Sequence, residues 1–333
     1  MKIGVIGAGS WGTTLANLLA KKGHHVTLWV YEAELVERLQ ESRINDLYLD
    51  GITLSSNLNY TSDLKEAAQG SQLMLLVSPS QVMRHVLKDL NDHLSEDCLL
   101  VSAAKGIENE TLMTMSEVLQ EVLGAQAAKR SAFLSGPSFA REVAVEQPTA
   151  VTVAAEDLAV AHRVQEVFST DYFRVYTNQD VVGVEIGGAM KNVIALAAGV
   201  GVGLGFNHNA RAALITRGLV EIARLGDAKG AQATTFYGLA GMGDLVLTCT
   251  GDLSRNRSVG IELGKGRKLD EILNKMNMVA EGVKTTLSAY QLAARLGVSM
   301  PITEQMYQVL YQEKDPKQAV ADLMTRDLTS EDE

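Results

Sequence analysis

The junction of a strand, a glycine-rich turn and a helix at the start of the chain limits the fold more than any other feature. A short apolar run leads into Gly-Ala-Gly-Ser-Trp-Gly at positions 7–12, and an apolar helical pattern follows. In such a turn, Gly7 permits the tight bend, Gly9 lets the backbone approach a pyrophosphate, and Gly12 lets the helix pack close to the strand. The N–H groups of the helix N-terminus then face the phosphates. The order of the three elements predicts dinucleotide binding, whereas the glycine spacing alone would also fit a purely structural corner.

Apolar runs typical of strands alternate with helical patterns over the first half of the chain. The expected strands lie at residues 3–6, 26–30, 73–77, 99–102, 132–134, 150–153 and 173–175. The expected helices between them lie at 32–42, 81–90, 112–123 and 158–168. Strands that are apolar throughout and alternate with helices are typical of a parallel sheet covered on both faces. The sequence therefore predicts an α/β domain with a doubly wound, Rossmann-type sheet.

The strand pattern stops near Tyr176, and the remaining sequence is rich in Ala, Leu, Met and Gly at helical spacing. The expected helices there lie at 183–200, 210–225, 285–296 and 303–310. Two domains are expected because 333 residues exceed the usual size of one hydrophobic core. We predict a dinucleotide-binding domain over 1–180, followed by an all-helical substrate and catalytic domain over 181–333.

Composition narrows the class of protein. The net charge of −10 argues against a nucleic-acid partner. Cys98 and Cys249 lie in apolar segments and are expected to be buried, reduced thiols, and the histidines show no metal-ligand spacing, so no metal is predicted. No segment is expected to have the length and apolarity to span a membrane, and no stable membrane insertion is expected. The opening strand leaves no room for a signal peptide, so a cytoplasmic location is expected.

A lysine and an asparagine interrupt an otherwise small and apolar helix, in the run Gly-Gly-Ala-Met-Lys-Asn at positions 187–192. Most lysines on helices extend their ammonium to solvent. The neighbouring positions offer few other polar residues, so this face is expected to be mostly buried, and burial would lower the pKa of Lys191 and suit it to proton transfer. From these residues alone, both interpretations of Lys191 stay open.

A second polar cluster follows a glycine-rich loop in the helical half. Asp244 ends the run Gly-Leu-Ala-Gly-Met-Gly-Asp, and Ser254, Arg255 and Asn256 follow it. These residues could be a helix cap and a solvated basic loop, but hydroxyl, guanidinium and amide donors together suit a phosphate monoester. Lys105 and the run Ser-Gly-Pro-Ser at 135–138 follow predicted strands, where open α/β sheets bind ligands. The sequence therefore favours a small phosphorylated substrate.

Taken in order, the motifs resemble those of the bacterial-type NAD(P)-dependent glycerol-3-phosphate dehydrogenases over essentially the whole chain. The matching stretches are GAGSWGT, SAAKGIE, LSGPSFAREV, GGAMKNVIALAAG, NARAALITRG, GLAGMGDLVLTCT, SRNRSVG, VAEGVKT and MPITEQMYQVLY. The resemblance implies hydride transfer between NAD(P)H and dihydroxyacetone phosphate, giving sn-glycerol 3-phosphate for glycerophospholipid synthesis. It also implies a homodimer.

The resemblance further implies roles for single residues. Lys191 matches the family's proton acceptor. The implied substrate contacts are Lys105, Gly136, Ser138, Lys191, Asp244, Ser254, Arg255 and Asn256. The implied cofactor contacts are Ser10, Trp11, Lys105, Ala140, Arg255, Val279 and Glu281, in addition to Gly7, Gly9 and Gly12 of the glycine-rich turn.

The end of the second predicted strand departs from the family pattern. Many members carry an arginine there that meets an adenosine 2′-phosphate, whereas this chain has Tyr31 and Glu32. Tyr31 is expected to lie beside the adenosine, and a carboxylate at Glu32 would accept a bond from the 2′-hydroxyl of NAD and repel the phosphate of NADP. Glu32 could instead serve only the first turn of the next helix. We therefore expect both NAD and NADP to be accepted.

Two alternatives remain open from the sequence. One is another enzyme with a Rossmann domain, a helical domain and a helix lysine, such as a β-hydroxyacid dehydrogenase, although the cluster at 254–256 favours a phosphorylated substrate. The other is a catalytically silent NAD(P)-binding sensor, which would be expected to lose Lys191 or the anion-binding cluster.

Overall fold

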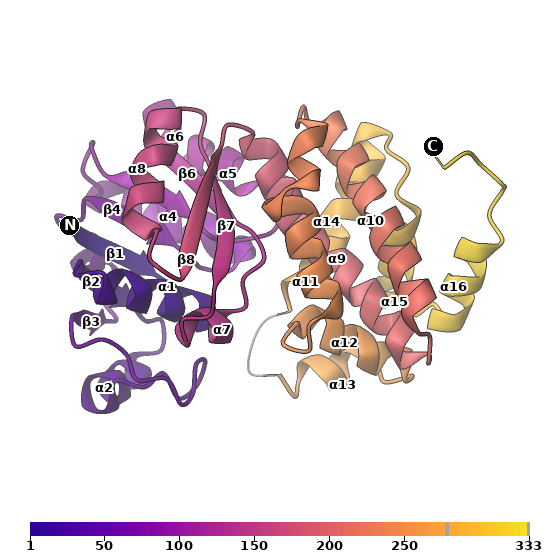
Figure 1. Cartoon of the computed structure of the whole chain (residues 1–333), viewed down its shortest axis with the longest axis horizontal. Coiled ribbons are helices and arrows are strands. Elements are labelled where there is room, and N and C mark those ends of the chain that lie inside the picture. Colours follow the sequence, from indigo (N-terminus) through magenta and orange to yellow (C-terminus); the bar gives the residue numbers. More distant parts are fainter. Residues whose placement is uncertain (277–279, 332–333) are drawn as a thin grey trace.

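A single sheet organises the N-terminal half of the molecule. A computed structural model describes residues 1–276 and 280–331 of the 333-residue chain (Figure 1). The strands are β1 (Lys2–Ile6), β2 (His25–Trp29), β3 (Leu58–Thr61), β4 (Leu73–Leu76), β5 (Leu99–Ser102), β6 (Ser131–Ser135), β7 (Thr149–Ala154) and β8 (Phe173–Asn178). Their order in the sheet is β3-β2-β1-β4-β5-β6-β7-β8.

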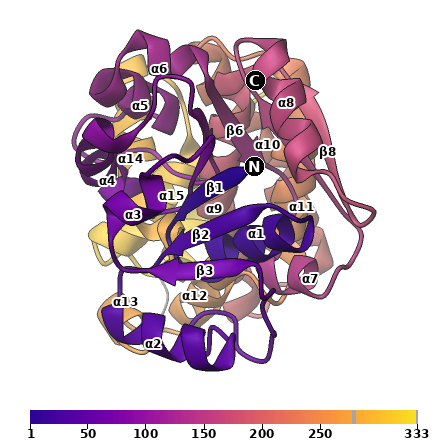
Figure 2. The same cartoon turned by 90° about the vertical axis from the view of Figure 1, so that its left-hand side faces the viewer.

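Helices cover both faces of this sheet, which confirms the predicted doubly wound arrangement (Figure 2). One face packs on α1 (Ser10–Lys21), α2 (Ala33–Ser42), α7 (Ala140–Ala144) and α8 (Leu158–Phe168). The other face packs on α3 (Leu64–Ala68), α4 (Met83–Leu90), α5 (Met115–Leu123) and α6 (Ala125–Lys129). Short 3₁₀ turns, η1 (Ser80–Val82) and η2 (Asn91–His93), flank α4.

The sheet differs from the predicted all-parallel arrangement at one pair. Strands β6 and β7 are antiparallel, and every other neighbouring pair is parallel. The connection from β6 to β7 holds only the one-turn helix α7, which is too short for the crossover that a parallel pair needs. Strand β3 was not predicted, because its four residues, Leu-Asn-Tyr-Thr, give little hydrophobic signal at the edge of the sheet.

The described residues after β8 form helices and the turns between them, as predicted. They comprise α9 (Val181–Gly203), α10 (His208–Ala228), η3 (Ala233–Tyr237), the π-helical turn η4 (Leu239–Gly243), α11 (Asp244–Thr250), α12 (Arg255–Gly264), α13 (Leu269–Leu273), α14 (Glu281–Leu296), α15 (Pro301–Tyr311) and α16 (Pro316–Met324). Figure 1 shows these helices gathered around α9 on one side of the sheet domain. The helices packed most extensively on α9 are α10, α11, α12 and α14.

Helix α9 is apolar on nearly every side because it is the core of this bundle. By length and composition alone it could cross a membrane, so the expectation that no segment of the chain has that character is wrong for Val181–Gly203. Most of this helix is buried inside the protein. Buried core helices of soluble proteins can have the same length and apolar composition as a membrane-spanning helix.

Helices α9 and α12 approach each other closely enough that only glycine fits between them. A Cβ on Gly199 would overlap the carbonyl oxygen of Arg257, and a Cβ on Gly260 would overlap that of Leu196. This backbone contact brings the first turn of α12 against the middle of α9, where Lys191 and Asn192 lie.

Candidate active site

Three charged side chains from different elements meet between the sheet and the helical bundle. Asp244, at the start of α11, accepts a bond from Lys191 Nζ on Oδ1 at 2.7 Å and from Lys105 Nζ on Oδ2 at 2.6 Å. Lys105 follows β5, and Lys191 lies in the middle of α9. Asp244 is 1% exposed and Lys191 9% exposed, so the sequence-based alternative of a lysine extended to solvent is wrong.

The local structure fixes each member of this ion cluster. The N-terminus of α9 is held by Asp180, whose carboxylate accepts bonds from Gly183 N and from Gln232 N, each at 2.9 Å. The carbonyl of Ala240 in η4 stands 2.6 Å from where a Cβ on Gly187 would lie, so the loop before Asp244 packs directly on α9. Lys105 Nζ also donates to Gly136 O at 3.3 Å, which joins the ends of β5 and β6.

Burial and charge set the protonation of the cluster. Burial lowers the pKa of Lys191 to about 8, against the opposing pull of the Asp244 carboxylate. Burial alone would raise the pKa of Asp244, but the two neighbouring ammonium groups outweigh it and hold that pKa below its usual value. A buried lysine with a pKa near neutrality can both donate and accept a proton, which is the requirement for a general acid and base.

Thr248 belongs to the same cluster, and the sequence analysis missed it. Its hydroxyl accepts from Lys191 Nζ at 2.9 Å and donates to the carbonyl of Asp244 at 2.6 Å. Thr248 stands four residues after Asp244 on α11, so the i, i+4 spacing of the two polar residues was a signal that could have found it.

The predicted anion-binding residues lie at the N-terminus of α12. Ser254 caps this helix by accepting from Arg257 N at 3.3 Å, and Arg255 is its exposed first residue. Within residues 1–276 and 280–331, the Arg255 guanidinium has neither a hydrogen bond nor an ion pair. A guanidinium beside a helix N-terminus suits a phosphate group, since both favour negative charge.

Asn256 ties this helix end to the ion cluster. Its Nδ2 donates to Asn192 Oδ1 at 2.9 Å, and its Oδ1 accepts from Gly282 N at 2.9 Å. Because Asn192 follows Lys191 and Arg255 precedes Asn256, this bond joins the helical turn of α12 that carries Arg255 to the turn of α9 that carries Lys191. These two bonds use half of the hydrogen-bonding capacity of the Asn256 amide, so one N–H and one acceptor lone pair remain.

The glycine-rich turn has the shape that a dinucleotide requires. Gly7 has a φ of +115°, and a Cβ on Gly12 would overlap the carbonyl of Gly7, so both positions need glycine. In the described part of the chain, no residue other than its two chain neighbours is found within 4 Å of where a Cβ on Gly9 would stand. Gly9 precedes the first turn of α1, so its open side faces the N–H groups that bind phosphate in such folds. These residues therefore fit a dinucleotide pyrophosphate.

The end of β2 carries the two residues expected beside the adenosine. Tyr31 is 79% exposed and lies edge-on to Trp29. Glu32 precedes α2, and its carboxylate accepts a bond from Tyr48 Oη at 2.6 Å. Sequence analysis missed Tyr48, since it lies in the irregular segment between α2 and β3 with no periodic signal.

The other predicted contacts lie on the same side of the sheet or at the junction with the bundle. Ser138 donates to Gly136 O at 3.0 Å, and Ala140 begins α7, where its carbonyl accepts from Thr14. Ser10 and Trp11 open α1, and Trp11 packs near Phe173. Val279 lies outside the described residues.

Glu281 begins α14 and reaches the sheet domain. Its carboxylate accepts from Ser80 N at 3.2 Å and from Ser80 Oγ at 3.0 Å, in the turn η1 that follows β4. Burial raises the pKa of Glu281 to about 7, against the effect of these bonds and of Arg255. This contact joins the two halves of the molecule on the side where the cofactor contacts are predicted.

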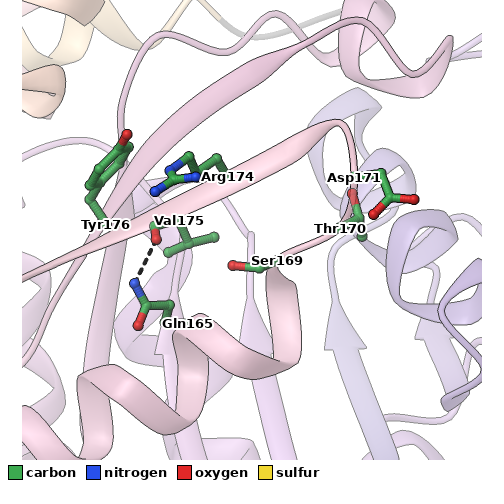
Figure 3. Close-up of a pocket in the computed structure, with 7 residues that line it drawn as sticks. All are labelled: Gln165, Ser169, Thr170, Asp171, Arg174, Val175 and Tyr176. Atoms are coloured by element: carbon green, nitrogen blue, oxygen red, sulfur yellow. Dashed lines mark hydrogen bonds between the residues drawn. The ribbon is translucent and has the colours of Figure 1, made fainter.

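One surface hollow lies away from this site. It has a volume of about 350 Å³. The residues that line it lie at the end of α8, along β8 and in the turn between them (Figure 3). Gln165 Nε2 donates to Val175 O at 2.7 Å and so occupies a backbone acceptor on this edge strand. None of the predicted site residues lines the hollow.

Comparison with known proteins gives one consistent result. Residues 2–161 match the N-terminal part and residues 180–321 the C-terminal part of the NAD-dependent glycerol-3-phosphate dehydrogenases. The chain is 66% identical over 331 residues to "Glycerol-3-phosphate dehydrogenase [NAD(P)+]" of Syntrophotalea carbinolica, covering 99% of each chain. It is 64% identical over 330 residues to the protein of that name from Citrifermentans bemidjiense, covering 99% of this chain and 98% of the other.

A solved structure agrees. The crystal structure of glycerol-3-phosphate dehydrogenase from Coxiella burnetii has a TM-score of 0.94 and 38% identity, and the match covers 98% of this chain and 99% of that one. The chain belongs to the NAD-dependent glycerol-3-phosphate dehydrogenase family.

Proposed function

We propose that the protein interconverts dihydroxyacetone phosphate and sn-glycerol 3-phosphate with NAD(H) or NADP(H), with Lys191 as its general acid and base. Relatives that match this chain over nearly their full length are named for this activity. The observation that carries the proposed chemistry is the buried ion cluster of Lys191, Asp244 and Lys105, which spans the sheet and the bundle. Family membership removes the β-hydroxyacid dehydrogenase alternative.

Lys191 has the surroundings that proton transfer needs. In the reduction, its ammonium would polarise the C2 carbonyl and donate a proton to the alkoxide oxygen as this forms. In the oxidation, the neutral amine would take the hydroxyl proton back. Asp244 and Thr248 orient Nζ through bonds of 2.7 and 2.9 Å, so the lysine need not be ordered when the substrate binds.

Lys105 and Arg255 supply the remaining positive charge. Lys105 shares the Asp244 carboxylate, which holds the two ammonium groups close together in spite of their repulsion. Arg255 would bind the substrate phosphate, with Ser254 and the helix N-terminus beside it. Binding energy gathered at the phosphate then positions C2, several bonds away, next to Lys191.

The glycine-rich turn and the end of β2 would hold the dinucleotide. Gly9 and the first turn of α1 would face the pyrophosphate, and Glu32 would face the adenosine ribose. When bound, the reduced nicotinamide supplies the hydride that C2 accepts. Lys105, Ala140 and Glu281 are the further contacts that the resemblance implies. A carboxylate at Glu32 favours NAD but does not by itself bar NADP, so we expect both to be accepted.

Four further proposals rest on the resemblance and the chain pattern. The dinucleotide-binding domain would comprise residues 1–180 and the helical domain 181–333, since β8 ends at Asn178 and α9 begins at Val181. The protein would be a cytoplasmic homodimer, and its product would serve glycerophospholipid synthesis. Light scattering after size-exclusion chromatography tests the dimer directly.

Substitution of Lys191 tests the chemistry. Lys191→Ala should keep the fold and NADH binding but lower kcat by about 10²–10⁴-fold, the usual contribution of a general acid or base. Lys191→Arg should recover little, because a guanidinium hardly releases its proton. The matched control is Lys229→Ala, which also removes an ion-paired lysine, the partner of Glu117, but lies outside the site. Near-normal turnover by folded Lys191→Ala would refute the role, and a wild-type protein that binds NADH without reducing the ketone would be the silent sensor.

A further inference from the structure

A small cavity lies beneath the ion cluster, where α9 meets the ends of β5 and β6. Ser102, Ser135 and Glu185 are polar residues of its wall, and the other residues that line it are Ala104, Lys105, Phe133, Leu134, Val184 and Gly188. The centre of a water molecule has about 10 Å³ in which to move. This is about the smallest space that holds one water, provided that two or more polar groups face it.

Two serine hydroxyls face this cavity without partners. Ser102 is 2% exposed and Ser135 is 5% exposed, and neither Oγ has a hydrogen bond to any described residue. Ser102 pairs with Phe133 across β5 and β6, and Ser135 lies two residues beyond Phe133. Side chains two residues apart on a strand share a face, so both hydroxyls point to the side that α9 covers. Buried hydroxyls left unpaired are costly, and native proteins rarely keep two together.

The third polar group comes from α9. The carboxylate of Glu185 accepts from the backbone N–H of Ser116 at 2.8 Å and from the Ser116 hydroxyl. A carboxylate oxygen can accept more than one hydrogen bond, so Glu185, which lines the cavity, can also accept one from a water molecule there. On the same helix, a Cβ at Gly188 would stand 2.7 Å from Ser135 Oγ, so Gly188 leaves the space open.

We propose that this cavity is a binding site for one internal water molecule, which bridges Ser102, Ser135 and Glu185. The water would satisfy both idle hydroxyls and join α9 to two strand ends of the sheet domain. Ser135 immediately precedes Gly136, whose carbonyl accepts from Lys105 Nζ. The bridge therefore links the helix that carries Lys191 to the strand end that holds Lys105.

Thermal unfolding of the full chain tests the water bridge. The test uses the change in Tm of Ser102→Ala, of Ser135→Ala and of the double variant. Ser102→Ala and Ser135→Ala should each lower Tm by about 2–4 °C, because each removes a bonded partner of the water. The Tm of the double variant should fall no further than that of the less stable single variant, because removal of either hydroxyl already releases the water. Ser131→Ala is the matched control: Ser131 is also buried on β6, but its hydroxyl donates to Ala127 O at 2.6 Å, so its loss should add to that of Ser102→Ala.

A dry cavity would behave in the opposite way. Alanine at either position would then leave Tm unchanged or raise it, because replacing an unpaired buried hydroxyl by a methyl group removes a penalty. That result, or losses at Ser102 and Ser135 that simply add, would overturn the proposal. A crystal structure at high resolution must also show a density peak within hydrogen-bonding distance of both hydroxyls. None of these measurements depends on the enzymatic activity.

Discussion

The charge of Asp244 controls the protonation of Lys191, and Asp244→Asn tests this directly. The amide keeps the shape of the side chain but removes the negative charge that two ammonium groups share at 2.6 and 2.7 Å. The carboxylate opposes the effect of burial on Lys191, so its loss must lower a pKa that is now about 8. An opposite charge at such a distance shifts a pKa by about 1–3 units, which would bring the pKa of Lys191 to roughly 5–7.

The sign of the effect differs between the two directions of the reaction. Reduction needs protonated Lys191, so a lower pKa moves the loss of activity at high pH to lower pH. For those shifts, the protonated fraction at about pH 7.5 falls roughly 3- to 240-fold, and the reduction rate falls with it. Oxidation needs the neutral amine, so its rise with pH begins at a lower pH in the variant.

The assay is the pH dependence of kcat/KM in each direction, followed by NADH absorbance. Asp252→Asn is the matched control, because Asp252 is an ion-paired but 95% exposed carboxylate on the loop before α12. Its pH profiles should match those of the wild type. Profiles of Asp244→Asn that keep their midpoints, or that move to higher pH, would show that Asp244 does not set the protonation of Lys191. The variant should also lose about 3–5 kcal/mol of stability, since buried Lys191 and half-buried Lys105 lose their counterion.

Three further predictions address other parts of the site. Arg255→Ala should lower kcat/KM for dihydroxyacetone phosphate by roughly 10- to 150-fold, since a charge-assisted bond contributes about 1.5–3 kcal/mol, but should hardly affect unphosphorylated dihydroxyacetone; equal losses would assign Arg255 to the cofactor or the fold. Glu32→Ala, and more weakly Tyr48→Phe, should shift preference towards NADPH, because Tyr48 holds the Glu32 carboxylate in place; an unchanged NADH/NADPH ratio would exclude Glu32 as the selector. Gly199→Ala should destabilise the protein by about 1–3 kcal/mol through contact with α12, whereas Gly201→Ala, with its nearest neighbour 3.8 Å from the new Cβ, should be tolerated.

The sequence predicts best what depends on neighbouring residues. Apolar runs indicated seven of the eight strands, and the spacing of apolar residues predicted the long helices α8 and α9 closely. The glycine-rich turn could be placed because strand, turn and helix are consecutive. One-turn elements such as α3, α6 and α7 gave no usable period, because five residues cannot establish one.

The sequence identified individual site residues as candidates, but it did not predict which distant residues contact each other. Lys105 and Asp244 are 139 positions apart, and only the packing of η4 on α9 brings them together. The same applies to the bond between Asn192 and Asn256, which depends on the glycine contact between α9 and α12. Local sequence patterns do not predict which helices pack together. The sequence therefore indicated the chemical groups of the site but not their arrangement.

The electrostatics of the site also explain how an acidic protein can bind an anionic substrate. With a net charge of −10, the protein as a whole repels a phosphate monoester, but at physiological ionic strength this repulsion is screened beyond about 8 Å. Around the site, the cations Lys105, Lys191 and Arg255 face the carboxylates of Asp244 and Glu281, and burial raises the pKa of Glu281 to about 7, so attraction prevails locally. A bound phosphate would then add negative charge near Lys191 and raise its pKa. The substrate itself would therefore favour the protonated lysine that its reduction requires, and an unphosphorylated ketone would lose this help as well as its anchor.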